Sequence, residues 1–316
     1  MNDVRRRVLN ALLGGLLWAM AAGAGAQTFP SRPVHIIVPF PPGGGTDTLI
    51  RLLGPRLSKQ WGQPVIIENK PGASGQIGSA VVAQSAPDGH TLLMASTAAI
   101  TVKNIRQFSP VALVSAEPYV VTLHPAVPAE NVRELITYAK AHPGKLSFGS
   151  SGIGAASHLS GELFKSMAGI DMMHVPYKGT GQALVDLLAG HIGVMFAPAQ
   201  TVLTQVQAGK LKAIATTGTK RLEALPKLPT VAGSGLPNYQ ALGWFGLLAP
   251  VATPKALVDR LNSDVNRILS LPEVRQEMAE RGGEPGSGSA DEFGRFITSD
   301  QIKWSKLMQD AGIVIE

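Results

Sequence analysis

Glycine-rich loops between strand-like and helix-like runs constrain the fold of this chain more than any other feature. Three such loops occur: residues 40–47 (FPPGGGTD), 149–158 (GSSGIGAASH) and 177–181 (YKGTG). The first follows the apolar, β-branched run 34–39, which is typical of a buried parallel strand. Strands that alternate with helices in this way predict an α/β protein with mostly parallel sheets.

The βα pattern restarts after Pro143-Gly144, which predicts two similar lobes. Runs 111–114, 119–123 and 242–249 predict strands, and the last two are expected to carry the chain between lobes. We therefore predict a first lobe made of residues 27–123 and 245–316 and a second made of residues 124–244. A cleft between two lobes is a common place for a small-molecule site.

Residues 1–26 have the three parts of an export signal. Arg5, Arg6 and Arg7 precede the apolar run 8–22, and the small residues Ala24-Gly25-Ala26 follow it. We expect cleavage after Ala26 and a periplasmic location. An uncleaved membrane anchor and a twin-arginine signal are the alternatives. The absence of cysteine excludes disulfides and lipoprotein acylation.

The charge balance points to no nucleic-acid partner. The formal charge is +6, and the first 26 residues contribute three Arg and one Asp, which leaves +4 without a basic patch. The histidines do not cluster at metal-ligand spacing, and the P-loop, G-x-S-x-G and H-E-x-x-H patterns are absent from the sequence. We therefore expect a monomer without metal, cofactor or catalytic activity.

The loops can recognise an anion, because helix N-termini offer free backbone N–H groups and a positive dipole end. Each loop can also be a simple turn with a helix cap, and Thr46 is the expected cap of the first helix. Asp47 either balances the helix dipole or accepts a hydrogen bond from ligand or water. His158 either caps or packs, or contacts an anion or Ser150. Phe40 and Tyr177 either pack in the core or line the cleft. Lys178 is the one cation within a loop, and its alternative is a solvated surface lysine.

Several motifs resemble the Bug family, the periplasmic solute-binding proteins of tripartite tricarboxylate transporter systems. They are PSRPV with IIVPFPPGGGTD, QPVIIENKPGA, PDG, LSFGS, VPYKG, AGKLK and WFGLLAP, in order along the chain. The resemblance implies a two-lobed, type II-like binding protein that closes over a small mono- or dicarboxylate and delivers it to integral membrane subunits. The binding residues that it implies are Phe40, Gly44, Gly45, Thr46, Asp47, Ser150, Ser151, Gly154, His158, Tyr177, Gly179 and Thr180, with Ser96 as a weaker candidate.

Two departures from the family pattern bear on the ligand. Ala197 stands where the family often has an acid, which weakens the case for an ammonium-bearing ligand such as an amino acid and leaves Asp47 as the alternative partner for an ammonium group. Segment 97–108 is shorter than usual, so the sequence does not determine how deep the pocket is on that side. A sensor component for a membrane receptor kinase and an exported hydrolase are the alternative functions.

Overall fold

The structure, a computed structural model, describes residues 29–280 and 283–312. The predicted export signal and its cleavage site therefore lie outside the described residues. Among the described residues, no helix is both long and apolar enough to cross a membrane.

Nine strands form one continuous sheet in the order β2-β1-β3-β9-β4-β7-β5-β6, with β8 also paired to β4. The strands are β1 (Val34–Val38), β2 (Val65–Asn69), β3 (Thr91–Ser96), β4 (Phe108–Leu123), β5 (Ser147–Ser150), β6 (Met173–Pro176), β7 (Val194–Pro198), β8 (Lys212–Thr216) and β9 (Leu242–Pro250). Strands β1, β2 and β3 are parallel, as are β5, β6 and β7, whereas β4 and β9 run antiparallel to their neighbours.

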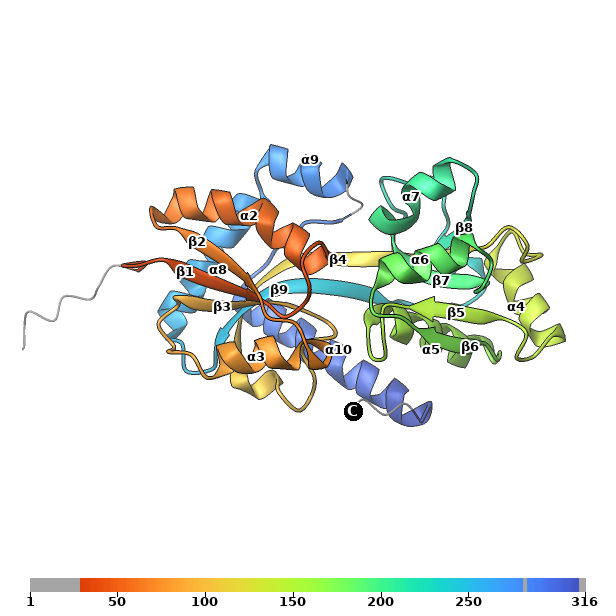
Figure 1. Cartoon of the computed structure of the whole chain (residues 1–316), viewed down its shortest axis with the longest axis horizontal. Helices are drawn as coiled ribbons and strands as arrows, with labels where there is room; N and C mark the ends of the chain where they lie inside the picture. The colour runs from red at the N-terminus through yellow and green to blue at the C-terminus, as the bar shows by residue number, and fades with distance from the viewer. Residues whose placement is uncertain (1–28, 281–282, 313–316) are drawn as a thin grey trace, which may run out of the picture.

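The sheet belongs to two lobes that share strand β4 (Figure 1). This long strand pairs with β9 as far as Pro118, with β7 from Tyr119 onward and with β8 from Val120 onward. The prediction of two separate strands at 111–114 and 119–123 is therefore wrong. Glu and Pro are disfavoured in sheet interiors, which made Glu117-Pro118 look like a break. The strand tolerates this pair because it changes partner there.

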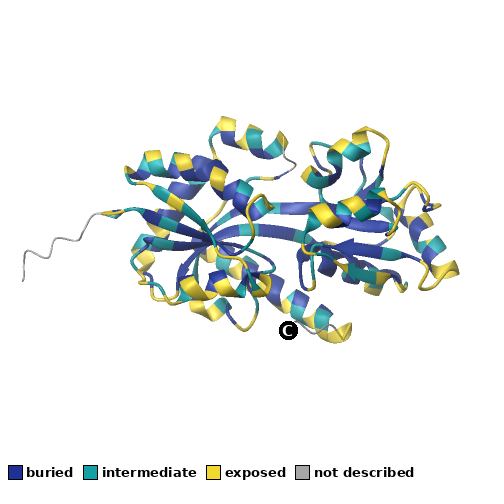
Figure 2. Cartoon of the chain, viewed as in Figure 1, coloured by how far each residue is buried: buried dark blue, intermediate teal, exposed yellow. Residues whose placement is uncertain are grey.

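Helices cover both faces of each half of the sheet (Figure 1). They are α2 (Gly45–Trp61), α3 (Gln76–Ala83), α4 (Val132–Ala141), α5 (Ala156–Ala168), α6 (Thr180–Leu188), α7 (Ala199–Gln207), α8 (Lys255–Leu269), α9 (Pro272–Glu280) and α10 (Ala290–Asp310). Figure 2 shows that the strands are mostly buried and that exposed residues gather on the outer faces of the helices. The mixed α/β fold with two lobes matches the predicted fold class.

Helix α10 connects the cores of the two lobes. Phe293 and Ile297, near its start, pack in a cluster with strands β3 and β9 of the first lobe. Trp304 and Leu307, near its end, pack with β5, α5 and β7 of the second lobe. Helix α10 therefore spans from one lobe to the other and borders the space between them.

Candidate ligand-binding site

The loop between β1 and α2 brings the first glycine-rich segment to the cleft. Helix α2 begins at Gly45 and has Gly44 at its cap position, with no side-chain cap. The prediction that Thr46 caps this helix is wrong, because Thr46 already lies in the first turn and is buried. The first amides of the helix are left without a side-chain acceptor among the described residues.

The Asp47 carboxylate is buried beneath this loop, with 3% of the residue exposed. It accepts hydrogen bonds from the Gly43 amide at 2.9 Å, Arg51 Nε at 2.9 Å and Asn69 Nδ2 at 3.0 Å. Burial favours the neutral acid, but these hydrogen bonds and the Arg51 charge together lower the pKa of Asp47. The contacts of Asp47 therefore hold the glycine loop in place.

The loop between β5 and α5 is braced by its own side chains. Ser157 Oγ accepts the Ser151 amide at 3.0 Å, and Ser150 Oγ accepts the Gly152 amide at 3.1 Å. His158 Nδ1 accepts the Gly154 amide at 3.1 Å, and His158 is buried. These three amides donate to protein acceptors, whereas the amides of the first turn of α5 have no side-chain acceptor within the part of the chain that the structure describes.

His174 supports the same loop and was not anticipated from the sequence. Its Nε2 lies 2.6 Å from Ser150 Oγ, and its ring stacks on His158 with a centroid distance of 3.8 Å. Of the alternatives for His158, the structure shows capping and packing, because its ring accepts the Gly154 amide and is buried, whereas Ser150 pairs with His174 instead. Burial lowers the pKa of His158 to about 3 and that of His174 to about 4, with further lowering by Lys165. Both rings are neutral near pH 7.

The third loop, between β6 and α6, is held through Tyr177. The Tyr177 hydroxyl donates to Asp186 Oδ2 at 2.6 Å, and burial followed by this hydrogen bond raises the tyrosine pKa to about 12. Gly179 occupies the cap position of α6 without a side-chain cap, and Thr180 is the first helical residue. The Lys178 amide donates to Gln182 Oε1 at 3.2 Å, and the lysine is exposed, as expected for a surface residue.

Helices that begin at the carboxyl ends of strands β1, β5, β6 and β7 share one property. Their caps are Gly44, Ala155, Gly179 and Pro198, and none supplies a side-chain acceptor. By contrast, Asn131 caps α4, and Ser289 forms a capping box at the start of α10. Helix α8 also lacks a side-chain cap, with Pro254 at that position. Both lobes thus direct uncapped helix ends toward the carboxyl edge of the sheet, where ligands bind in open α/β folds.

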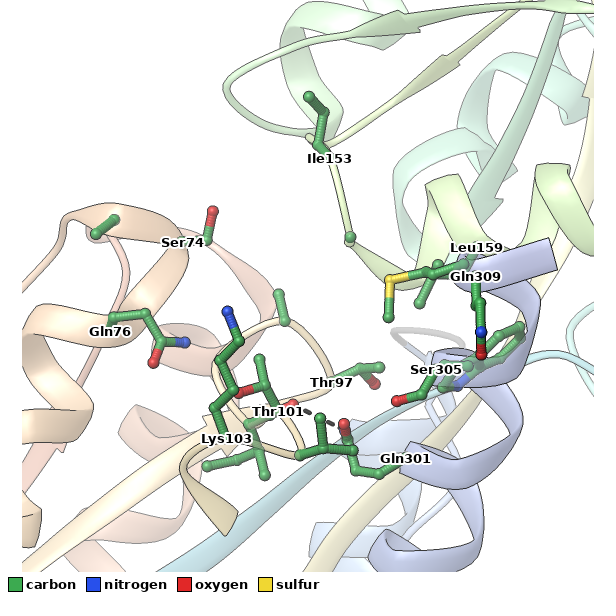
Figure 3. A pocket seen from close by; sticks show the side chains of 17 residues that line it. Ser74, Gln76, Thr97, Thr101, Lys103, Ile153, Leu159, Gln301, Ser305 and Gln309 are labelled. Atoms are coloured by element: carbon green, nitrogen blue, oxygen red, sulfur yellow. Dashed lines mark hydrogen bonds between the residues drawn. The ribbon is translucent and has the colours of Figure 1, made fainter. Parts of the chain in front are cut away.

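A cavity of about 440 Å³ lies between the lobes. Figure 3 shows its walls: Ser74, Gln76 and Lys103 from the first lobe, Ile153 and Leu159 from the second, and α10 below. Of the residues predicted for the site, only Gly154 lines this cavity. Ser96 does not line it, but its neighbour Thr97 does.

Two close approaches connect the first loop to its surroundings. A Cβ at Gly75 would lie 3.2 Å from Phe40 Cζ, so the Phe40 ring packs against the segment that carries Ser74 at the cavity wall. A Cβ at Gly45 would lie 2.9 Å from Phe245 Cζ and 3.7 Å from Gln200 Nε2, at the start of α7. Glycine at position 45 lets the start of α2 pack closely against Phe245 of β9, with Gln200 of the second lobe nearby.

Comparison with known proteins shows to which family the chain belongs. Residues 49–313 match the model of the tripartite tricarboxylate transporter family receptor. The chain belongs to this family. The receptor is 34% identical to protein BugT of Bordetella pertussis over 304 residues, which cover 93% of each chain. The resemblance inferred from the motifs is confirmed.

Solved structures of similar proteins share the fold of the receptor. One is Rpa4515 of R. palustris with adipate, with a TM-score of 0.80 and 33% identity over 90% of this chain and 99% of that one. Another is MatC from Rhodopseudomonas palustris with bound malate, with a TM-score of 0.77 and 30% identity over 88% and 99%. The chain is thus a periplasmic solute-binding protein of the receptor family.

Proposed function

We propose that this receptor captures a small organic carboxylate between its lobes and delivers it, unchanged, to the integral membrane subunits of a tripartite tricarboxylate transporter. The observation that carries the proposal is the set of uncapped helix starts contributed by both lobes. Such ends stabilise negative charge through free N–H groups and the helix dipole. The relatives solved with adipate and malate support the same ligand class.

The proposed contacts differ in kind between residues. We assign direct ligand contact to the Gly44–Thr46 and Gly179–Thr180 segments and to the first turn of α5, with Phe40 beside them. The residues that act by positioning are those whose side-chain polar atoms are engaged with the protein, namely Asp47, His158, Ser150, Ser151 and Tyr177. Gly154 contributes backbone to the cavity wall. A carboxylate held by preorganised N–H groups needs no cationic partner in the loops.

Closure is proposed to occur where the chain passes between the lobes. We place the first connection at Pro118–Tyr119, where β4 changes partner, a few residues before the predicted boundary between the lobe of residues 27–123 and 245–316 and the lobe of residues 124–244. The return lies near Ala241, whose amide donates to the Thr217 carbonyl at 3.0 Å. Rotation about two adjacent connections is the usual hinge motion of two-lobed binding proteins. The remaining parts of the proposal are export to the periplasm and action as a monomer without cofactor.

A binding screen tests the proposal. The mature chain, from Gln27 onward, is heated with mono- and dicarboxylates, hydroxy acids, amino acids and neutral sugars, and the melting temperature is recorded. We expect carboxylates alone to raise it, and native mass spectrometry of the mixture to recover the ligand with its mass unchanged. Stabilisation by sugars or cations alone would refute anion capture, and a changed ligand mass would favour the hydrolase alternative.

A further inference from the structure

Strands β4 and β9 both run from one lobe into the other (Figure 1). Their antiparallel ladder ends at the pair Pro118 and Leu242. In the same register Tyr119 and Ala241 would be the next opposite pair, because a step forward along one strand is a step back along the other. Thr217, the residue that follows β8, is hydrogen-bonded to both of them instead. A third segment of the chain therefore joins the two connections between the lobes.

Thr217 makes four hydrogen bonds to these connections. On the β4 side, its amide donates to the Tyr119 carbonyl at 2.8 Å, and its Oγ1 accepts the Tyr119 amide at 2.7 Å. On the β9 side, its Oγ1 donates to the Ala241 carbonyl at 2.6 Å, and its carbonyl accepts the Ala241 amide at 3.0 Å. These four bonds form the Thr217 bridge. Thr217 is fully buried, so the bridge is shielded from water.

The hydroxyl group lets this one residue bond to both sides. In a regular hydrogen-bonded antiparallel pair, two residues exchange both of their N–H···O bonds. Here the Thr217 carbonyl accepts from Ala241, and Oγ1 takes its place as the acceptor of the Tyr119 amide. Valine has nearly the same shape but no hydroxyl. It would leave the buried Tyr119 amide and Ala241 carbonyl without this partner, which is costly.

The Thr217 bridge is anchored in the second lobe. The preceding residue, Thr216, ends β8, and its amide donates to the Pro229 carbonyl at 2.8 Å. Its carbonyl accepts the Val231 amide at 2.9 Å. Both crossing segments are thus fixed to the second lobe at the bridge. Bending of the connections then falls on the first-lobe side, at Pro118 and Leu242, where the β4–β9 ladder ends.

We propose that Thr217 couples the two connections, so that they bend together and the lobes rotate about a single axis when the receptor closes. Thr217 is a positioning residue that acts through Tyr119 and Ala241. The inference rests on the closure that the proposed function assigns to these connections, but it does not depend on the chemical class of the ligand. Without the hydroxyl, the two connections bend separately, and the lobes sample a wider range of orientations.

The interlobe distance in the ligand-free mature chain tests this inference. The natural sequence has no cysteine, so Ala80→Cys on α3 and Thr204→Cys on α7 allow specific attachment of one spin label to each lobe. Both positions are exposed. Double electron–electron resonance then gives the distribution of distances between the two labels.

Three variants are compared in this labelled background. Thr217→Val removes the hydroxyl, and Thr217→Ser keeps it. Thr122→Val is the matched control, because Thr122 is also fully buried and lies in β4. Its hydroxyl donates at 3.2 Å to the Val120 carbonyl of the same strand, so its loss removes a hydrogen bond without separating the connections.

We expect Thr217→Val to broaden the distance distribution, whereas Thr217→Ser and Thr122→Val should keep the wild-type width. An unchanged width in Thr217→Val, or equal broadening in either of the other variants, overturns the inference and leaves carboxylate capture standing. Failure of every carboxylate in the thermal screen would refute capture without altering this result, because the labelled protein is free of ligand.

Amide hydrogen exchange adds a measurement on the wild-type protein. If one bridge holds both connections, the Tyr119 and Ala241 amides open together and have similar protection factors. Thr217→Val should lower both protection factors at least about tenfold, as expected for the loss of a buried hydrogen bond. Wild-type protection factors that differ by more than about tenfold would show separate opening and overturn the inference, whether or not the variant folds.

Discussion

The carboxylate of Asp47 accepts a hydrogen bond from the backbone amide of Gly43, four residues earlier, at 2.9 Å. Arg51, one turn later on α2, donates to the same carboxylate. A buried negative charge thus ties the glycine loop to the helix that follows it. The loop is preorganised by the protein, and the amides of the first helical turn remain open for a ligand.

Replacement of Asp47 by Ala should destabilise the protein and weaken carboxylate binding. Three donors lose their acceptor, and a hydrogen bond to a charged group contributes about 1.5–3 kcal/mol. We expect a loss of about 2–3 kcal/mol in the free energy of unfolding, measured by urea denaturation of the ligand-free protein. Asp291→Ala, in the exposed first turn of α10, is the control and should cost less than about 1 kcal/mol. Equal effects of the two substitutions would contradict the positioning role.

Replacement of Thr180 by Pro should weaken ligand binding about tenfold, because it removes one backbone donor from the start of α6. Proline suits the first position of a helix, and the preceding Gly179 is extended, so the helix itself should persist. Thr180→Ala removes the hydroxyl but keeps the amide. Isothermal titration that shows the same affinity for the two variants would rule out a role for this amide.

The stacked pair His158 and His174 should make stability fall as the pH is lowered from about 6.5 to 4. Their folded-state pKa values are about 3 and 4, whereas unfolded histidine titrates near 6.5. In that interval the unfolded state binds more protons, so stability is lost by at most about 1.4 kcal/mol per pH unit for each ring.

The buried acids Glu117 and Asp300 act in the opposite direction, with burial raising their pKa values to about 7 and about 6. The test therefore compares the wild-type protein with the double variant His158→Asn and His174→Gln by urea denaturation at several pH values. The stability advantage of the wild-type protein should shrink from pH 7 to pH 4.5. A constant difference would mean that the rings titrate normally.

Replacement of Gly243 by Ala should disturb the connection between the lobes. A Cβ at this position would lie 2.6 Å from the Tyr119 hydroxyl oxygen, and Tyr119 is buried where β4 changes partner. Overpacking of this kind costs about 1–3 kcal/mol. Gly181→Ala, where a Cβ would meet no atom within 4 Å, should leave the free energy of unfolding unchanged or raise it by up to about 1 kcal/mol. Equal stabilities of the two variants would show that the Tyr119 contact relaxes freely.

Local patterns predicted most of the elements correctly, because strand and helix periods and glycine at helix starts are read within a few residues. The glycine-rich segment 40–47 leads into a helix as expected, with α2 beginning at Gly45, and Asn131 caps α4 through the Glu134 amide. The errors concern partners distant in sequence. Ser150 and His174 are 24 residues apart and meet because β5 and β6 pair in parallel register, which the sequence spacing does not reveal.

By itself, the sequence determined the α/β class, the order of strands, loops and helices, and the family to which the chain belongs. These properties follow from local periodicity and from motifs that are contiguous in the chain. The tertiary structure alone decided that Ser150 pairs with His174 and that Trp304 and Met308 of α10 line the cavity between the lobes. Those relationships depend on contacts between residues up to about two hundred positions apart, and such contacts exist only after the chain has packed.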